Sequence, residues 1–283
     1  MKVFPWRGTA RRWRAVPLLG LFLVPSLTAK PPQPEDAEAV RWFAAVNRQR
    51  LRTSWHLTLA MTLRNDRGFR RDLELDARWA AWKDTAAALV VVREPASVRG
   101  TAMLSREEIR SGAEHRSWVF LNTRSPLVVE VPGNSRAEGL LGSDFSHADQ
   151  QRLLDTAEWK LSSLGETACG TSRCVRIEGV RRRAKRGPLD PDRAVWWIDK
   201  SRKEVVRAQQ FAADRPLKTL EVTEWAAAEG VWIPRRQTMR TLETGSETVL
   251  TLIRFERVTT FPEADFRPEN LPEQARRTAG KSR

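Results

Sequence analysis

Two stretches near the start of the chain alternate apolar and polar or small residues. In the first, residues 54–63, the apolar positions are Trp55, Leu57, Leu59, Met61 and Leu63. In the second, residues 72–81, they are Leu73, Leu75, Ala77 and Trp79. Successive side chains of a β-strand point to opposite faces, so a period of two predicts strands with one buried face. The turn signal Asn65-Asp66-Arg67-Gly68 lies between the stretches, which predicts an antiparallel hairpin.

The same pattern continues along most of the chain. Further strand segments are expected at residues 87–92, 100–104, 118–121, 127–131, 158–164, 175–180, 194–198, 205–211, 218–225, 232–241 and 248–258. So many short strands, separated by glycine and proline turn signals, indicate an antiparallel sheet curled toward a barrel. Two helices should accompany it, one over residues 37–50 after the capping residue Asp36, and one over residues 146–155, where Ser146 and Asp149 fit a capping box.

The first 29 residues have the layout of a cleavable signal peptide. An apolar stretch over residues 15–24 and a small-residue exit at residues 26–29 follow a basic start with no acidic residue, made of Lys2, Arg7, Arg11, Arg12 and Arg14. The apolar stretch is shorter than the about 20 residues that a membrane-spanning helix needs; a retained membrane anchor is the alternative. We expect cleavage after Ala29, a soluble protein in the periplasm, and a proline-rich spacer over residues 30–36.

The chain is strongly basic, with a formal net charge of +14, and without the five positive charges of the signal peptide +9 remains. Such a charge suits nucleic acid, anionic lipid or acidic partners, but export argues against nucleic acid. The densest cluster, residues 181–186, runs into the turn signal Gly187-Pro188. We interpret it as a solvated hairpin tip, with a lipid-headgroup contact as the alternative.

The two cysteines, Cys169 and Cys174, flank the turn-rich segment Gly170-Thr171-Ser172-Arg173. An oxidising compartment favours a disulfide, which would staple a tight β-hairpin. A redox centre would need two residues between the cysteines, and a zinc site would need two further ligands nearby. We therefore predict a structural disulfide and expect neither a metal nor a cofactor.

Ser143, Asp144 and His147 lie within five residues and suggest a hydrolase. A serine nucleophile, however, normally sits on a strained turn and receives its base from elsewhere in the fold. Asp144 and Ser146 are better suited to bonding backbone N–H groups of a turn. We predict a binding protein rather than an enzyme, and retain an envelope hydrolase as the least favoured alternative.

No other residues suggest a catalytic or metal site. His56 is expected on the outer face of a strand and His115 in a polar loop, so they form no metal-binding pair. The two acids of Asp190-Pro191-Asp192 are too few for a calcium loop and predict a turn.

Several strings occur together in a fixed order. They are Arg99–Leu104 (RGTAML), Trp118–Leu121 (WVFL), Gly139–Ser146 (GLLGSDFS), Trp197–Lys200 (WIDK), Gly230–Pro234 (GVWIP) and Phe261–Phe266 (FPEADF). In this order and spacing the chain resembles the LolA-like outer-membrane lipoprotein-sorting proteins, over nearly all of the presumed mature chain. The most specific piece is Gly142-Ser143-Asp144-Phe145. One departure is the segment at residues 127–131, which is apolar here and often basic in the family.

The resemblance implies a curved, incompletely closed antiparallel β-barrel covered by short helices, here over residues 37–271. Its hollow would hold the acyl chains of a lipoprotein or lipid. An inner-membrane transporter would be the donor and an outer-membrane protein the acceptor. We expect a monomer, with a basic disordered tail over residues 272–283.

The residues expected to line the hollow are apolar positions of the predicted strands and of the family motif. They are Trp55, Leu57, Leu59, Met61, Leu75, Trp79, Trp118, Phe120, Leu140, Leu141, Phe145 and Trp197. The chain has twelve tryptophans and no tyrosine, and these side chains could also simply fill a small barrel. A second possible role is an RseB-like envelope sensor; such sensors carry an additional C-terminal domain, so a carrier is favoured.

Overall fold

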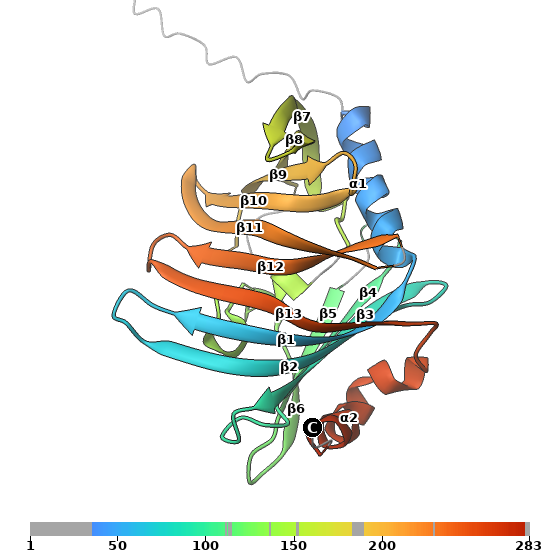
Figure 1. Ribbon diagram of the computed structural model, residues 1–283, viewed down its shortest axis with the longest axis vertical. Coiled ribbons are helices and arrows are strands. Elements are labelled where there is room, and N and C mark those ends of the chain that lie inside the picture. Colours follow the sequence, from blue (N-terminus) through green and yellow to red (C-terminus); the bar gives the residue numbers. More distant parts are fainter. Residues whose placement is uncertain are drawn as a thin grey trace, which may run out of the picture. The chain divides into compact units, whose positions relative to one another are not determined.

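Thirteen antiparallel strands form one continuous sheet in the part of the chain that the structure describes (Figure 1). The computed structural model describes residues 36–110, 112, 115–135, 137–150, 153–182, 190–228 and 230–280. The expected signal peptide, nearly all of the spacer and most of the basic cluster at residues 181–186 lie outside these residues.

Every predicted strand segment corresponds to a strand of the structure, which confirms the predicted fold class. The strands are β1 (Ser54–Arg64), β2 (Arg70–Ala81), β3 (Thr85–Glu94), β4 (Ala102–Glu108), β5 (His115–Leu121), β6 (Leu127–Glu130), β7 (Trp159–Cys169), β8 (Ser172–Arg181), β9 (Arg193–Asp199), β10 (Glu204–Ala212), β11 (Arg215–Ala228), β12 (Val231–Thr241) and β13 (Ser246–Val258).

The first and last strands lie side by side in the middle of the sheet. The strand order is β6-β5-β4-β3-β2-β1-β13-β12-β11-β10-β9-β8-β7, so β1 pairs with both β2 and β13. β6 and β7 are the two edges and do not pair with each other, which leaves the curved sheet an incomplete barrel. We call the face that carries Trp55, Leu57 and Met61 the inner face, and the opposite face the outer face.

The connection between β6 and β7 joins opposite edges of the sheet, and we call its described residues between 131 and 158 the cover. It contains three short 3-10 turns, Gly133–Ser135, Leu140–Gly142 and Ala148–Gln150. The helix predicted over residues 146–155 is wrong; among its described residues only the last of these turns forms. An extended chain rises about 3.3 Å per residue against 1.5 Å in a helix, so a segment that must cross the sheet has few residues to spare for a helix.

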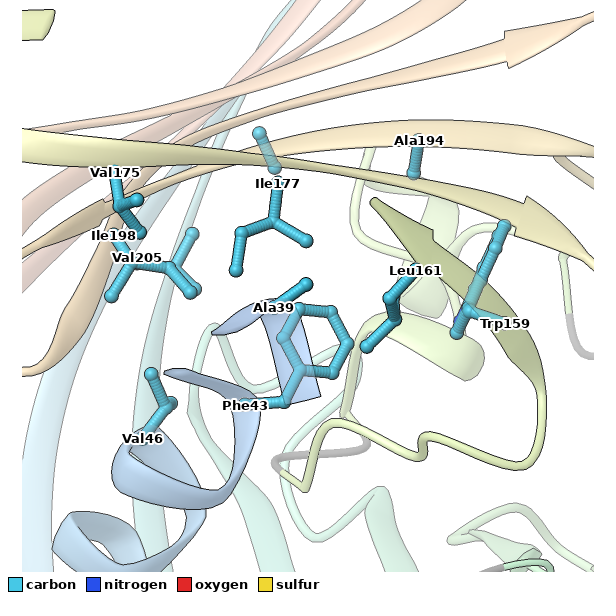
Figure 2. Close-up of a cluster of buried hydrophobic side chains, with 11 residues drawn as sticks. Ala39, Phe43, Val46, Trp159, Leu161, Val175, Ile177, Ala194, Ile198 and Val205 are labelled. Atoms are coloured by element: carbon cyan, nitrogen blue, oxygen red, sulfur yellow. The ribbon is translucent and has the colours of Figure 1, made fainter. Parts of the chain in front are cut away.

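The predicted first helix is confirmed as α1 (Ala37–Leu51). The carboxylate of Asp36 caps it by accepting the backbone N–H groups of Glu38 and Ala39. Its apolar face carries Ala39, Phe43 and Val46, which pack against inner-face residues of β7–β10 (Figure 2). The helix therefore covers this part of the inner face.

The tail predicted as disordered from residue 272 is instead largely helical. Two 3-10 turns, Glu263–Phe266 and Pro268–Asn270, lead into α2 (Leu271–Ala279). The guanidinium of Arg78 on the outer face of β2 donates to Gln274 at 3.0 Å and to Thr278 at 2.7 Å. Although the tail is polar in composition, its few apolar residues share one face, and that face is buried on the sheet.

The predicted disulfide is present. Cys169 and Cys174 are bonded across the β7–β8 hairpin, with 5.8 Å between their Cα atoms. Neither of the two α-helices in the described part of the chain has the length and apolar character needed to cross a membrane.

Candidate functional site: a covered hollow in the half-barrel

A cavity of about 370 Å³ lies between the inner face of the sheet and the cover. Its apolar wall comes from strands distant in sequence and includes Ala77, Ala88, Val90, Met103, Leu220, Ile233, Met239 and Leu250. The cover contributes Leu140, Phe145 and Leu153 from the opposite side. The volume falls within the about 300–1,000 Å³ that is usual for small-molecule sites. The half-barrel is thus hollow rather than completely filled.

Seven of the residues predicted for the hollow line this cavity. They are Trp55, Leu57, Leu59 and Met61 of β1, Leu75 of β2, and Leu140 and Phe145 of the cover. Those of β1 and β2 are placed by the strand alternation. The two cover residues belong to the string GLLGSDFS, which folds back on itself through the hydrogen bond from Leu140 N to Phe145 O at 2.7 Å.

Trp79 and Leu141 lie beside the cavity without lining it. Trp79 is fully buried, stacks on Trp55 with 6.4 Å between the ring centroids, and donates its indole N–H to the backbone oxygen of Arg50. Leu141 packs into an apolar cluster that includes Leu63 and Leu73. Both residues support the wall.

Trp118, Phe120 and Trp197 lie on the outer face, so their predicted place in the hollow is wrong. Trp118 and Phe120 belong to the apolar cluster that Phe266 and Leu271 cover. Trp197 has the guanidinium of Arg207 4.8 Å from its ring centroid. In each case the neighbouring residues of the strand point inward.

Sequence reasoning missed part of the wall. Trp159, Trp196, Ala208 and Leu220 line the cavity from β7, β9, β10 and β11. Their signal was present, because each occupies an alternate position in a predicted strand. For the pair Trp196-Trp197, however, alternation alone does not say which of two adjacent tryptophans faces inward.

Asp144 of the family motif fixes the cover to the sheet. Its carboxylate accepts hydrogen bonds from the hydroxyls of Thr248 at 2.7 Å and Ser246 at 2.5 Å, both on β13. Its backbone N–H donates to Thr248 Oγ1 at 2.9 Å, and its backbone oxygen accepts Lys218 Nζ of β11 at 2.8 Å. Motif and sheet are therefore joined by the buried pair Asp144 and Thr248 and by the half-buried Ser246 and Lys218.

The margin of the cavity is charged. Arg50 of α1 forms an ion pair with Glu204 of β10 at 2.9 Å, and Arg181 of β8 forms one with Glu158 of the cover. The guanidinium of Arg181 also lies 4.7 Å from the ring centroid of Trp159. These pairs connect helix, cover and sheet around the apolar wall.

Ser143 and Asp144, two of the three residues that suggested a hydrolase, serve the turn, and the backbone N–H of the third, His147, donates to the backbone oxygen of Glu138 at 3.2 Å. The Ser143 hydroxyl donates to the backbone oxygen of Phe145 at 3.1 Å, and the Asp144 carboxylate is engaged by β13. Ser146 and Asp149 form the reciprocal hydrogen bonds expected of a cap, although only a 3-10 turn follows.

The two other histidines lie on different faces. His56 lies on the outer face, as predicted, with Nε2 2.6 Å from Asp76. His115, predicted in a polar loop, begins β5, where it is buried with Nε2 3.2 Å from the Ser117 hydroxyl. No cluster of three potential metal ligands occurs among the residues that the structure describes.

Known structures of the same fold include three bacterial proteins. A protein from Vibrio parahaemolyticus named as an outer membrane lipoprotein-sorting domain has a TM-score of 0.73 at 18% identity, covering 81% of this chain and 97% of its own. A DUF1329 family protein from Desulfovibrio piger has a TM-score of 0.74 at 22% identity, covering 82% and 98%. A LolA superfamily protein from Nitrosomonas europaea has a TM-score of 0.60 at 18% identity, covering 81% and 97%.

The fold and its covered hollow thus define a LolA-like half-barrel, as the resemblance implied. At these identities the likeness establishes the fold. A family model described as an uncharacterized protein matches residues 84–273, which is more than half of the chain. The chain belongs to this family. No curated protein matches it by sequence.

Proposed function

We propose that this protein is a periplasmic carrier that holds the acyl chains of a lipoprotein or lipid in its hollow and moves them toward the outer membrane. The observation that carries the proposal is the covered cavity of about 370 Å³ with an apolar wall from both halves of the sheet. Burial of an acyl chain there would stabilise the complex by about 0.8 kcal/mol per CH₂ group. The name of the Vibrio parahaemolyticus structure supports the same role.

The proposal is of a binding protein rather than an enzyme. The basic, apolar and small-residue pattern of residues 1–29 supports export. A transporter in the inner membrane as donor and a protein at the outer membrane as acceptor complete the proposed route.

A substitution that fills the hollow tests the role of the cavity. Ala88 lines the hollow from β3, and Ala88→Trp would place an indole in it. Ala60 lies on β1 between Leu59 and Met61 and faces the outer side, so Ala60→Trp is a matched control. Both variants should first show wild-type secondary structure and cooperative unfolding.

The measurement is the binding of a fluorescent acyl-chain probe, with lipid extracted from the purified protein and identified by mass spectrometry. We expect Ala88→Trp to weaken binding at least about tenfold, a difference of 1.4 kcal/mol, and to lose co-purified lipid, while Ala60→Trp retains both. The absence of probe binding and of co-purified lipid in the wild-type protein would contradict the proposal. Equal binding by the two variants would exclude the hollow as the site.

A further inference from the structure

Lys218 places an ammonium group in the wall of the hollow. It lies on β11, two residues from the wall residue Leu220 and therefore on the same face of the strand. Its side chain is only 13% exposed. The cation thus sits where the apolar wall meets the polar margin formed by the cover.

Among the residues that the structure describes, the hydrogen bonds of Lys218 leave donors unused. An ammonium group has three N–H donors, and one donates to the backbone oxygen of Asp144 at 2.8 Å. The nearest carboxylate oxygen, Asp149 Oδ2, is 3.8 Å away, beyond hydrogen-bonding distance. That oxygen already accepts the backbone N–H and hydroxyl of Ser146 at 2.8 and 2.7 Å, and Oδ1 accepts Gln210 at 3.2 Å.

The other two cations described in the hollow differ from Lys218. Arg50 donates from two nitrogens to Glu204, and Arg181 donates to Glu158. A donor that is largely shielded from water and has no acceptor is costly. A ligand oxygen at Lys218 would remove that cost, so the position favours a ligand with an acceptor group at one end of its apolar chain.

The charges around Lys218 favour a neutral acceptor. The carboxylate of Asp149 is 3.8 Å from the ammonium group, and Asp144 supplies both the bound backbone oxygen and a second carboxylate. A carboxylate or phosphate would add negative charge beside the carboxylates of Asp149 and Asp144. A carbonyl oxygen would accept the hydrogen bond without adding charge.

We propose that Lys218 donates to a carbonyl oxygen of an ester-linked or amide-linked acyl chain, and that the hollow selects such chains over free fatty acids. This inference rests on the proposed function, since it assigns the head-group end of the same hollow. The linkage is the chemistry that lipoproteins and glycerolipids share.

Three probes with the same chain length test the assignment: methyl laurate, laurate and dodecane. Each of the three is added in increasing amounts to protein that holds a fluorescent acyl-chain reporter, and the displacement of the reporter is measured. The measurement is made in wild type and in Lys218→Met, which keeps the length of the side chain without its donors. In wild type, methyl laurate should bind about tenfold more tightly than dodecane, as expected for a hydrogen bond to a charged group. Laurate should bind more weakly than methyl laurate.

Lys218→Met should abolish the preference for methyl laurate over dodecane, whatever the loss of its hydrogen bond to Asp144 in the cover does to the binding of all three probes. Lys218→Arg keeps charge and donors and should retain the preference. If Lys218 only held the cover, Lys218→Met would weaken all three probes equally, which would overturn the assignment. The wild-type comparison stands without the variants, so a variant that fails to fold leaves the test intact.

The possible failures are distinguishable. Equal binding of methyl laurate and dodecane by wild type would overturn the Lys218 assignment and leave the carrier proposal in place. Tighter binding of laurate than of its ester would overturn the choice of a neutral carbonyl. Binding of none of the probes would overturn the proposed function itself.

Discussion

The hydroxyl of Thr248 on β13 donates to the carboxylate of Asp144 in the cover at 2.7 Å, and both residues are buried. The hydrogen bond joins parts of the chain 104 residues apart. It connects the family motif to the central strand of the sheet. The position of the cover over the hollow should therefore depend on this pair.

Thr248→Val removes the hydroxyl and keeps the shape of the side chain. We expect it to destabilise the protein by about 1–3 kcal/mol, because the buried carboxylate of Asp144 loses the hydroxyl that donates to it and the backbone N–H of Asp144 loses its acceptor. Hydrogen exchange should accelerate in the cover, at residues 139–149, and stay unchanged in α2. As a control, Thr251→Val changes a more exposed threonine of the same strand. Unchanged exchange in the cover would show that Thr248 does not hold it.

Gly139 is required by a close approach within the cover. A Cβ atom at this position would lie 2.1 Å from the backbone oxygen of Ser143, which cannot move without breaking the turn. We expect Gly139→Ala to displace the motif, lower the melting temperature and weaken probe binding. Ala137→Gly, in the same segment, should lower the melting temperature and weaken probe binding much less than Gly139→Ala does. A crystal structure of Gly139→Ala with an unchanged turn would contradict this expectation.

The helix α2 should be a structural part of the half-barrel. Leu271 is buried with Phe266 and Ala275 on the outer face of β3–β5. Leu271→Ala should cost about 2–5 kcal/mol of unfolding free energy, as for other buried leucines. Arg276→Ala, on the exposed side of the same helix, should cost much less. Chemical denaturation measures both, and equal effects would show that the helix does not contribute through this apolar contact.

The same helix explains the main errors in predicting the hollow from sequence. Because residues 261–279 cover the outer face of β4 and β5, these strands carry buried apolar residues on both faces, and Trp118 and Phe120 point away from the cavity. A period of two locates a strand and separates its faces, but cannot name the inner face when both are buried. For β1 one face is more polar, and the alternation alone indicates that Trp55, Leu57, Leu59 and Met61 share the face that lines the cavity.

The cover was less predictable because its conformation follows from long-range contacts. Ser146 and Asp149 form the local hydrogen bonds of a capping box. These bonds favour a helix, but the connection must span the distance between opposite edges of the sheet, and this requires a more extended chain. The partners of Asp144 and Lys218 likewise come from distant strands, and no pattern within the cover indicates them.

Asp36 should make the stability of the protein depend on pH. The backbone N–H of Ser163 on β7 donates to its carboxylate at 2.8 Å and lowers the pKa of Asp36, and the N–H groups of Glu38 and Ala39 lower it further against the opposing effect of burial. A carboxyl with a lower pKa in the folded state stabilises that state above its unfolded pKa of about 3.9. This stabilisation is lost as the pH falls through the folded pKa.

Asp36→Asn removes this titration and retains a side chain that can cap a helix. We expect wild type to exceed Asp36→Asn in stability at about pH 6, and the difference to shrink at about pH 3, because below the unfolded pKa of about 3.9 the unfolded chain takes up the proton first. The unfolding free energy of both proteins is measured with urea at the two pH values. The other carboxylates contribute equally to both proteins, so their contribution cancels in the difference. A constant difference between the proteins would mean that the hydrogen bonds from Ser163 and α1 do not depend on the charge of Asp36.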